Sequence, residues 1–285
     1  MTASAKAPLT VREALERSAA HLARRPLLVC SDFDGTLSQI VLDPWAAAIL
    51  PLGRAALRRL AGMPGVAVVV LSGRTATDAA ERVRVGNVTY LGNHGMERGY
   101  LRRGGRPERI KTTVIGASPE AAEAAVRIAR QLAERLPEPW LVVEPKPPSV
   151  AFHYRQAPDV DAAGARVRAL VDELDPDFVL ERFPGRRILE LRPPGAIAKG
   201  EALRGLLDEL KPASVFMLGD DVSDALAFAV LREARRAGGT DGVAVAIQAR
   251  AEVPPQVAST ADIVLSSPRD AARYLSGIAS RVAGS

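Results

Sequence analysis

The sequence predicts an α/β protein with a doubly wound, mostly parallel sheet and a smaller inserted α+β unit. Apolar runs such as GVAVVVLS (65–72) are continuous, which is typical of parallel strands covered by helices on both faces. These runs alternate with amphipathic segments early and late in the chain. The middle of the chain instead alternates polar and apolar residues, as antiparallel hairpins do.

The elements of the parallel sheet follow one another in two blocks. The first block begins with a helix that Thr10 is expected to cap. Strands are expected at 26–33, 65–72, 88–93, 214–220, 242–248 and 262–267. Helices are expected at 9–25, 47–62, 75–83, 199–210, 223–237 and 268–282.

The segment between the two blocks repeats a helix and a hairpin twice. Helices are expected at 118–136 and 159–174, and hairpins at 140–155 and 177–193, the second with a turn at Pro184 and Gly185. The sequence therefore predicts a catalytic core formed by residues 1–105 and 193–285, with residues 106–192 inserted as an α+β cap domain.

Composition excludes several classes of function. The chain has 285 residues, 47% of them hydrophobic and 25% charged, as in ordinary globular proteins. A net charge of +5 raises the possibility of nucleic acid, but aromatic residues make up only 4% and basic residues are dispersed among acids. No apolar run is long enough to span a bilayer. A single cysteine and a charged N-terminal region predict a cytoplasmic protein, and we expect a monomer.

Polar groups gather at the ends of the predicted strands. In open parallel sheets, ligands bind at the carboxyl ends of the strands. The segments that follow these ends are SDFDGT (31–36), SGR (72–74), GNHGME (92–97) and GDDVSD (219–224), and Lys199 opens the helix before the fourth. The sequence therefore predicts one polar site at this edge of the sheet.

Phosphoryl transfer is the chemistry that suits this set. Asp32, Asp34 and Asp220 offer hard oxygen ligands for Mg²⁺, and there is no Cys/His cluster with zinc spacing. Strand geometry places Asp32 and Asp34 on one face, so that one could attack phosphorus while the other handles protons. The donors available for a phosphate are the Ser72 hydroxyl, the Gly35 and Gly73 amides and the Lys199 ammonium.

Each motif taken alone has a simpler explanation. Asp221 and Asp224 would more often cap the helix at 223 than bind a metal, and SGR by itself indicates little. Cys30 suits a small core residue, because a cysteine-dependent phosphatase needs an arginine where Thr36 stands. A P-loop signature is absent. The order of the motifs at successive strand ends is what favours a phosphatase.

The motifs resemble those of the haloacid dehalogenase superfamily of phosphatases: DFDGTL, LSGR, Lys199 and GDDVSD. Further segments are similar to its trehalose-6-phosphate phosphatase family, namely GNHGME, VEPKPPSVAFHYR, ELRPPGAIAKG and MLGDDVSDALAF. The resemblance covers about Pro26 to Phe228. It implies a Mg²⁺-dependent hydrolysis of trehalose 6-phosphate, a small-molecule sugar phosphate, through an aspartyl-phosphate.

The resemblance also implies roles for single residues. Asp32 would be the nucleophile and Asp34 the acid and base. Mg²⁺ would be held by Asp32, the Asp34 carbonyl and Asp220, with Asp221 and Asp224 nearby, each as a further ligand or as a support of the ligands. Phosphate would be bound by Gly35, Ser72, Gly73 and Lys199, and the sugar by Asn93, His94, Glu144, Lys146 and Glu190.

The sequence departs from the family pattern after the fourth strand. Ser223 replaces the commoner threonine, and Ala225 and Leu226 stand where acids are usual, which changes the surroundings of the metal ligands. Two alternatives stay open: a phosphatase of the same superfamily for sucrose phosphate or a glycosyl-phosphoglycerate, and a non-catalytic phosphate-responsive module. Asp34 argues against the second, because a long-lived acyl phosphate has no use for an adjacent acid.

Overall fold

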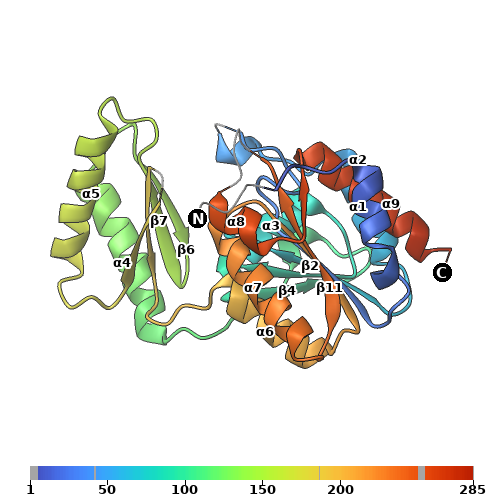
Figure 1. Ribbon diagram of the computed structural model, residues 1–285. Coiled ribbons are helices and arrows are strands. Elements are labelled where there is room, and N and C mark those ends of the chain that lie inside the picture. Colours follow the sequence, from blue (N-terminus) through green and yellow to red (C-terminus); the bar gives the residue numbers. More distant parts are fainter. Residues whose placement is uncertain (1–5, 42, 186, 250–253, 285) are drawn as a thin grey trace. The chain divides into compact units, whose positions relative to one another are not determined.

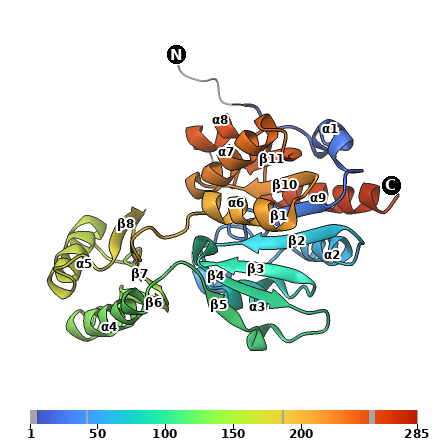
Figure 2. The ribbon, with the colours of Figure 1, turned by 90° about the horizontal axis from the view of Figure 1, so that it is seen from below.

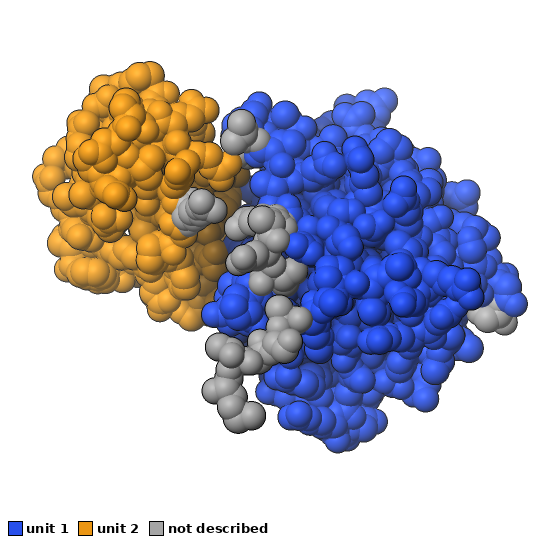
Figure 3. Space-filling model, turned by 45° about the horizontal axis from the view of Figure 1, so that its top comes forward, with its two compact units in different colours: residues 1–113, 197–285 blue, residues 114–196 orange. Residues whose placement is uncertain are grey.

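The chain folds into two compact units. The computed structural model describes residues 6–41, 43–185, 187–249 and 254–284. Residues 1–113 and 197–285 form one unit, here called the core unit, and residues 114–196 form the inserted unit (Figure 3). Both boundaries lie later in the chain than the expected 106 and 192. At the first boundary, the strand Thr112–Val114 still pairs in the core sheet.

The described strands of the core unit form an eight-stranded sheet in the order β12-β11-β10-β1-β2-β3-β4-β5 (Figure 2). It is parallel from β12 to β3, and β4 is antiparallel to β3. From β1 the chain adds β2 and β3 on one side, and it later adds β10 on the other side of β1. The strand order thus reverses between the neighbours β1 and β10, and open sheets bind their ligands at such a point. The strands are β1 (Leu27–Ser31), β2 (Val66–Leu71), β3 (Val88–Gly92), β4 (Glu97–Leu101), β5 (Thr112–Val114), β10 (Ser214–Gly219), β11 (Asp241–Ile247) and β12 (Ile263–Leu265).

Helices cover both faces of this sheet (Figure 1). Leu27 and Val29 pack into one apolar layer, and Leu28 and Cys30 pack into the other. The first layer is closed by α1 (Val11–Arg17), α2 (Pro51–Leu60), α3 (Ala76–Val83) and α9 (Pro268–Val282), and the second by α6 (Lys199–Leu210), α7 (Val222–Arg236) and α8 (Pro255–Thr260). Burial on both faces explains why the strand sequences are apolar throughout.

Several boundaries differ from the sequence prediction. The first helix ends at Arg17 instead of continuing to residue 25, and the second begins at Pro51, whose missing N–H suits a first helical turn. β4, β5 and α8 were not anticipated, because they are short and partly polar. Single 3-10 turns occur as η1 (Ala19–His21), η2 (Pro44–Ala46), η3 (Asn93–Gly95) and η4 (Pro107–Arg109).

The inserted unit is a four-stranded antiparallel sheet covered by two helices. The sheet has the order β6-β7-β9-β8, formed by β6 (Val142–Lys146), β7 (Ser149–His153), β8 (Glu181–Gly185) and β9 (Ile188–Arg192). Val150, Phe152 and Leu189 pack under α4 (Pro119–Arg135) and α5 (Val160–Leu174), which lie on one side of the sheet (Figure 1). The residues between them in sequence therefore point to the opposite face. Among the described residues, no helix has the length and apolar character needed to cross a membrane.

Candidate active site

The site begins at the loop that follows β1. The backbone N–H of Asp32 donates to the carbonyl of Leu218 in β10 at 2.9 Å, so the loop stays tied to the neighbouring strand. Gly35 has a φ of +79°, and a Cβ atom there would lie 2.3 Å from Oδ2 of Asp220. Only glycine allows both this backbone conformation and so close an approach. The Asp32 and Asp220 loops are thus brought together at the point where the topology reverses.

Lys199 is the first residue of α6 and is buried between two carboxylates. Its Nζ donates to Asp32 Oδ1 at 2.7 Å and to Asp224 Oδ1 at 2.8 Å. The other oxygen of Asp224 accepts from the backbone N–H groups of Asp220 and Asp221 at 3.1 and 3.2 Å. Asp224 therefore fixes both the lysine and the loop after β10.

Buried carboxylates outnumber the ammonium between them. Oxygens of Asp32, Asp220 and Asp224 lie within 4.8 Å of one another. Burial raises the pKa of Asp32 to about 8, with Lys199 opposing the shift and Asp220 adding to it. Burial likewise raises the pKa of Asp224 well above its ordinary value, against the influence of Lys199. A cluster of hard, anionic oxygen donors fits Mg²⁺.

Lys199 keeps its charge in this environment. Burial by itself would lower the pKa of the ammonium, but the carboxylates of Asp224 and Asp32 outweigh it and raise the pKa well above the ordinary value. A permanent cation beside Asp32 is what a phosphate-binding site needs.

Asp221 caps a helix. Its Oδ1 accepts from the backbone N–H of Ser223 at 2.8 Å, from the Ser223 hydroxyl at 2.7 Å and from the N–H of Asp224 at 3.2 Å. Burial opposes it, but Lys199 and these hydrogen bonds lower the pKa of Asp221. Among the described residues, the third carboxylate of the cluster with Asp32 and Asp220 is that of Asp224 and not that of Asp221. Where acids are usual, Ala225 packs into the core and Leu226 is exposed.

The loops after β2 and β3 hold each other in place. The N–H of His94 donates to the Ser72 carbonyl at 2.9 Å, and that of Asn93 to the Arg74 carbonyl at 2.8 Å. A Cβ atom at Gly73 would lie 2.9 Å from the His94 ring, so this ring lies directly against the glycine. The structure therefore brings the expected phosphate-binding residues Ser72 and Gly73 together with Asn93 and His94.

Glu97 has a structural role that sequence reasoning did not identify. Its Oε2 accepts from the backbone N–H of Ala76 at 2.7 Å, which supplies a partner for the amino end of α3. Gly92 is needed for the same approach, since a Cβ atom there would lie 2.1 Å from the Ala76 nitrogen.

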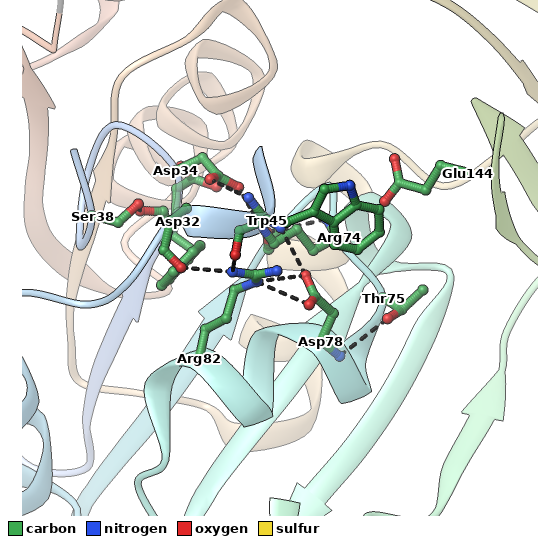
Figure 4. A network of polar contacts seen from close by, with 12 residues as sticks. Asp32, Asp34, Ser38, Trp45, Arg74, Thr75, Asp78, Arg82 and Glu144 are labelled. Atoms are coloured by element: carbon green, nitrogen blue, oxygen red, sulfur yellow. Dashed lines mark hydrogen bonds and ion pairs between the residues drawn. The ribbon is translucent and has the colours of Figure 1, made fainter. Parts of the chain in front are cut away.

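Asp34 lies in a charged network of its own (Figure 4). Arg74 donates to both of its carboxylate oxygens, from Nε to Oδ2 at 2.7 Å and from Nη2 to Oδ1 at 2.8 Å. Arg74 also donates to Asp78 Oδ2 at 2.8 Å. Sequence reasoning missed Arg74. The available signal was its position directly after Ser72 and Gly73, at the end of a buried strand.

One face of the inserted sheet carries the expected sugar-binding residues. Strand register aligns Glu144, Ala151, Glu190 and Phe183 in one row across the sheet. Lys146 Nζ lies 2.9 Å from Glu190 Oε1, and Arg192 donates to Glu190 Oε2 at 2.7 Å. These residues form what we call the polar face: Glu144, Lys146, His153, Phe183, Glu190 and Arg192.

Three members of the polar face, His153, Phe183 and Arg192, were not assigned from the sequence. Glu144 pairs with His153, 2.8 Å from its Nε2. The Arg192 guanidinium lies over the Phe183 ring, 4.6 Å from the centroid. Alternation along a strand was the available signal for His153 and Arg192, since both fall on the same side as Glu144 and Glu190.

Comparison with known proteins identifies the family. The family model described as trehalose-phosphatase matches residues 30–268. The chain belongs to the trehalose-phosphatase family. The matched residues include parts of the core unit and the whole of the inserted unit.

Curated relatives in the family include proteins from mycobacteria. Trehalose-phosphate phosphatase of Mycobacterium tuberculosis is 38% identical over 215 residues, which are 74% of this chain and 52% of that protein. The protein of the same name from Mycobacterium avium is 36% identical over 95% of this chain and 66% of its own length. The chain thus spans about half the length of the first of these relatives.

Solved structures show the same fold. The C-terminal domain of trehalose-6-phosphate phosphatase from C. albicans superposes with a TM-score of 0.72 at 24% identity, covering 98% of this chain and 99% of that one. A trehalose-6-phosphate phosphatase related protein gives a TM-score of 0.68 at 18% identity, covering 89% and 97%. These likenesses show that the chain shares their fold.

Proposed function

We propose that this chain hydrolyses trehalose 6-phosphate to trehalose and phosphate. The observation that carries the proposal is the buried Asp32, hydrogen-bonded to Lys199 at 2.7 Å, at the end of a central strand. Membership of the trehalose-phosphatase family supports the choice of substrate.

In the proposed reaction Asp32 is the nucleophile. Its carboxylate oxygen forms a bond to phosphorus while the bond between phosphorus and the sugar oxygen breaks. Asp34, protonated at the start, gives that oxygen its proton. The ionised Asp34 then takes a proton from water, whose oxygen attacks the phosphorus of the aspartyl-phosphate while the bond from phosphorus to Asp32 breaks and phosphate leaves. The Ser72 hydroxyl, the Lys199 ammonium and the backbone N–H groups of Gly35 and Gly73 would bind the phosphate oxygens.

We propose Mg²⁺ as the cofactor. Asp32, Asp220 and the backbone carbonyl of Asp34 would hold it, with Asp224 and Asp221 beside them. When bound, it supplies positive charge against the repulsion between an anionic carboxylate and an anionic phosphate, on the order of 4 kcal/mol per pair of unit charges at ~4 Å. Lys199 supplies a second positive charge, beside Oδ1 of Asp32.

The polar face would recognise the sugar. Carboxylates accept hydrogen bonds from hydroxyl groups, and ammonium groups donate them. Glu144, Lys146 and Glu190 share this face of the inserted unit, which would act as a cap over the disaccharide. Asn93 and His94 would contact the sugar from the core unit. We also propose that the protein acts as a cytoplasmic monomer.

A panel of phosphate esters tests the proposal. Phosphate release is measured on trehalose 6-phosphate, sucrose 6-phosphate, glucosyl-3-phosphoglycerate, glucose 6-phosphate and p-nitrophenyl phosphate, with Mg²⁺ or with a chelator. We expect the highest kcat/KM on trehalose 6-phosphate and loss of activity with the chelator. A protein inert on every ester with Mg²⁺ present would exclude the enzymatic function. Preference for another ester would replace the substrate.

A further inference from the structure

We infer that Arg74 is a positioning residue that holds the carboxylate of Asp34 in place for proton transfer. This inference rests on the proposed function, because it gives Asp34 the role of acid and base. It concerns a residue outside the set that contacts phosphate or sugar.

The contact between the two side chains fixes the plane of the carboxylate. Arg74 donates two parallel hydrogen bonds, at 2.7 and 2.8 Å, one to each oxygen of Asp34 (Figure 4). Such a two-point contact sets both the position and the rotation of a carboxylate, which a single ammonium does not. The Asp34 side chain is 43% exposed, whereas that of Asp32 is 6% exposed. Packing therefore restrains Asp34 less than it restrains the nucleophile.

Arg74 is itself held from several sides. Its side chain is only 10% exposed, and its guanidinium lies 5.5 Å from the centroid of the Phe33 ring. Nη1 donates to Asp78 at 2.8 Å. Its backbone N–H donates to the Ser72 hydroxyl at 3.2 Å. An arginine fixed in this way is suited to orient the residue that it contacts.

Asp78 and Arg82 extend the support to the loop after β1. Arg82 Nε lies 2.9 Å from both oxygens of Asp78, and its Nη1 donates to the backbone carbonyls of Trp45 and Ala47 at 2.9 and 2.6 Å. Arg74 is therefore linked through two side chains of α3 to the backbone of the segment that follows β1.

The paired carboxylate keeps capacity for the reaction. A carboxyl group offers about four lone-pair positions, and Arg74 occupies two of them, one on each oxygen. A third position can carry the proton that goes to the oxygen of the leaving sugar. Once vacated, the same position accepts a proton from the attacking water. Arg74 should therefore matter most where Asp34 matters most, in the departure of an alkoxide that needs a proton.

Two substrates separate this role from a purely structural one. A sugar alkoxide leaves poorly without a proton, whereas p-nitrophenolate leaves without one. The ratio kcat/KM reports steps up to the first irreversible one, here the formation of the aspartyl-phosphate. It is measured on trehalose 6-phosphate and on p-nitrophenyl phosphate for the wild type, Arg74→Ala, Arg74→Lys, Asp34→Asn and the double variant Asp34→Asn/Arg74→Ala.

We expect Arg74→Ala to lose about 10- to 100-fold on the sugar phosphate, part of the 10²- to 10⁴-fold that acid–base catalysis contributes, and less than about 3-fold on the aryl phosphate. Arg74→Lys should lose less activity than Arg74→Ala, because lysine keeps the positive charge although it cannot make the two-point contact of the guanidinium. In the Asp34→Asn background, Arg74→Ala should add less than about 2-fold, since both changes remove one function.

Arg98→Ala is the matched control. It removes another arginine that donates to both oxygens of a carboxylate, here Glu209 at 2.6 and 2.8 Å, but no contact with Asp34, so the ratio of the two kcat/KM values should stay at the wild-type value. Equal losses on both esters for Arg74→Ala, a gain on the sugar phosphate, or an additive loss in the double variant would each overturn the inference while leaving the proposed function in place. A wild type inert on both esters would instead overturn the proposed function.

Discussion

The core unit and the inserted unit position their charged residues by different means. Around Asp32, the positions are set by backbone: strand ends, a hydrogen bond to β10, and glycines such as Gly35 and Gly219 that stand where a Cβ atom would strike a carboxylate. On the polar face, the positions are set by strand alternation and by pairing among side chains, as between Lys146 and Glu190.

Because of this difference, we expect substitutions to have different effects in the two regions. A change in the core loops alters the positions of several site residues at once, because each loop is tied to its neighbours. A change on the polar face alters one side chain and leaves the sheet intact, since the apolar face beneath α4 and α5 holds that sheet together. We expect the reaction to depend on the core unit and substrate choice on the inserted unit.

The strongest test removes the nucleophile. Asp32→Asn should lower kcat by about 10⁴-fold or more on every ester, because an amide oxygen is a poor nucleophile and no covalent intermediate forms. Binding of trehalose 6-phosphate, measured by calorimetry, should persist. Thermal unfolding should stay near the wild-type midpoint, since the change removes one of three clustered buried carboxylates. A loss confined to the disaccharide phosphate would break the comparison.

A test of intermediate size removes a carboxylate of the polar face. Glu144→Ala should lower kcat/KM on trehalose 6-phosphate by about 10²-fold, since it deletes a charged acceptor for sugar hydroxyls. The value on p-nitrophenyl phosphate should change by less than about 3-fold. Glu134→Ala, which removes an exposed acid of α4, is the control and should change neither value. Equal losses on both esters would remove the assignment of the polar face to the sugar.

The sequence predicts most strands and helices of the core unit but fewer of the contacts between its side chains. Continuous apolar runs reveal the buried parallel strands, and chain order places Asp32, Ser72 and Asp220 at their ends. Whether Asp221 or Asp224 faces Lys199 depends on how α7 packs against α6, and nothing local distinguishes the two acids. The fork from Arg74 to Asp34 joins residues that are adjacent only after β1 and β2 pair.

In the inserted unit, too, the side-chain contacts depend on packing that the sequence does not reveal. Alternation in β6 and β7 indicates which residues share a face, so Glu144 and Lys146 could be placed together. The contact between Lys146 and Glu190 also needs the register of β9 against β7, which depends on packing of the whole sheet. In the same way, the pair of Glu144 with His153 depends on the register of β6 against β7.

The smallest expected effect concerns the surroundings of Asp34. Asp34 is held by side chains, as the residues of the polar face are, and not by backbone. Burial by itself would raise the pKa of Asp78, but hydrogen bonds from Arg82 and Arg74 lower it below its ordinary value. A carboxyl group whose pKa is lowered in the folded state stabilises the protein above its unfolded pKa of about 3.9, and this contribution is lost as the pH falls through the folded value.

Asp78→Asn should therefore cost about 1 to 2 kcal/mol of unfolding free energy at pH 7, because two partly buried guanidinium groups lose a charged partner. The difference between wild type and variant, measured by urea unfolding at pH 7, 5 and 3, should shrink below about pH 4 as Asp78 becomes protonated in the wild type. Glu209→Gln is the control, since its pair with Arg98 is exposed and should contribute less than about 1 kcal/mol. A difference for Asp78→Asn that stays constant down to pH 3 would show that the charge of Asp78 does not hold this network together, and that the support of Asp34 comes from backbone, as it does for Asp32.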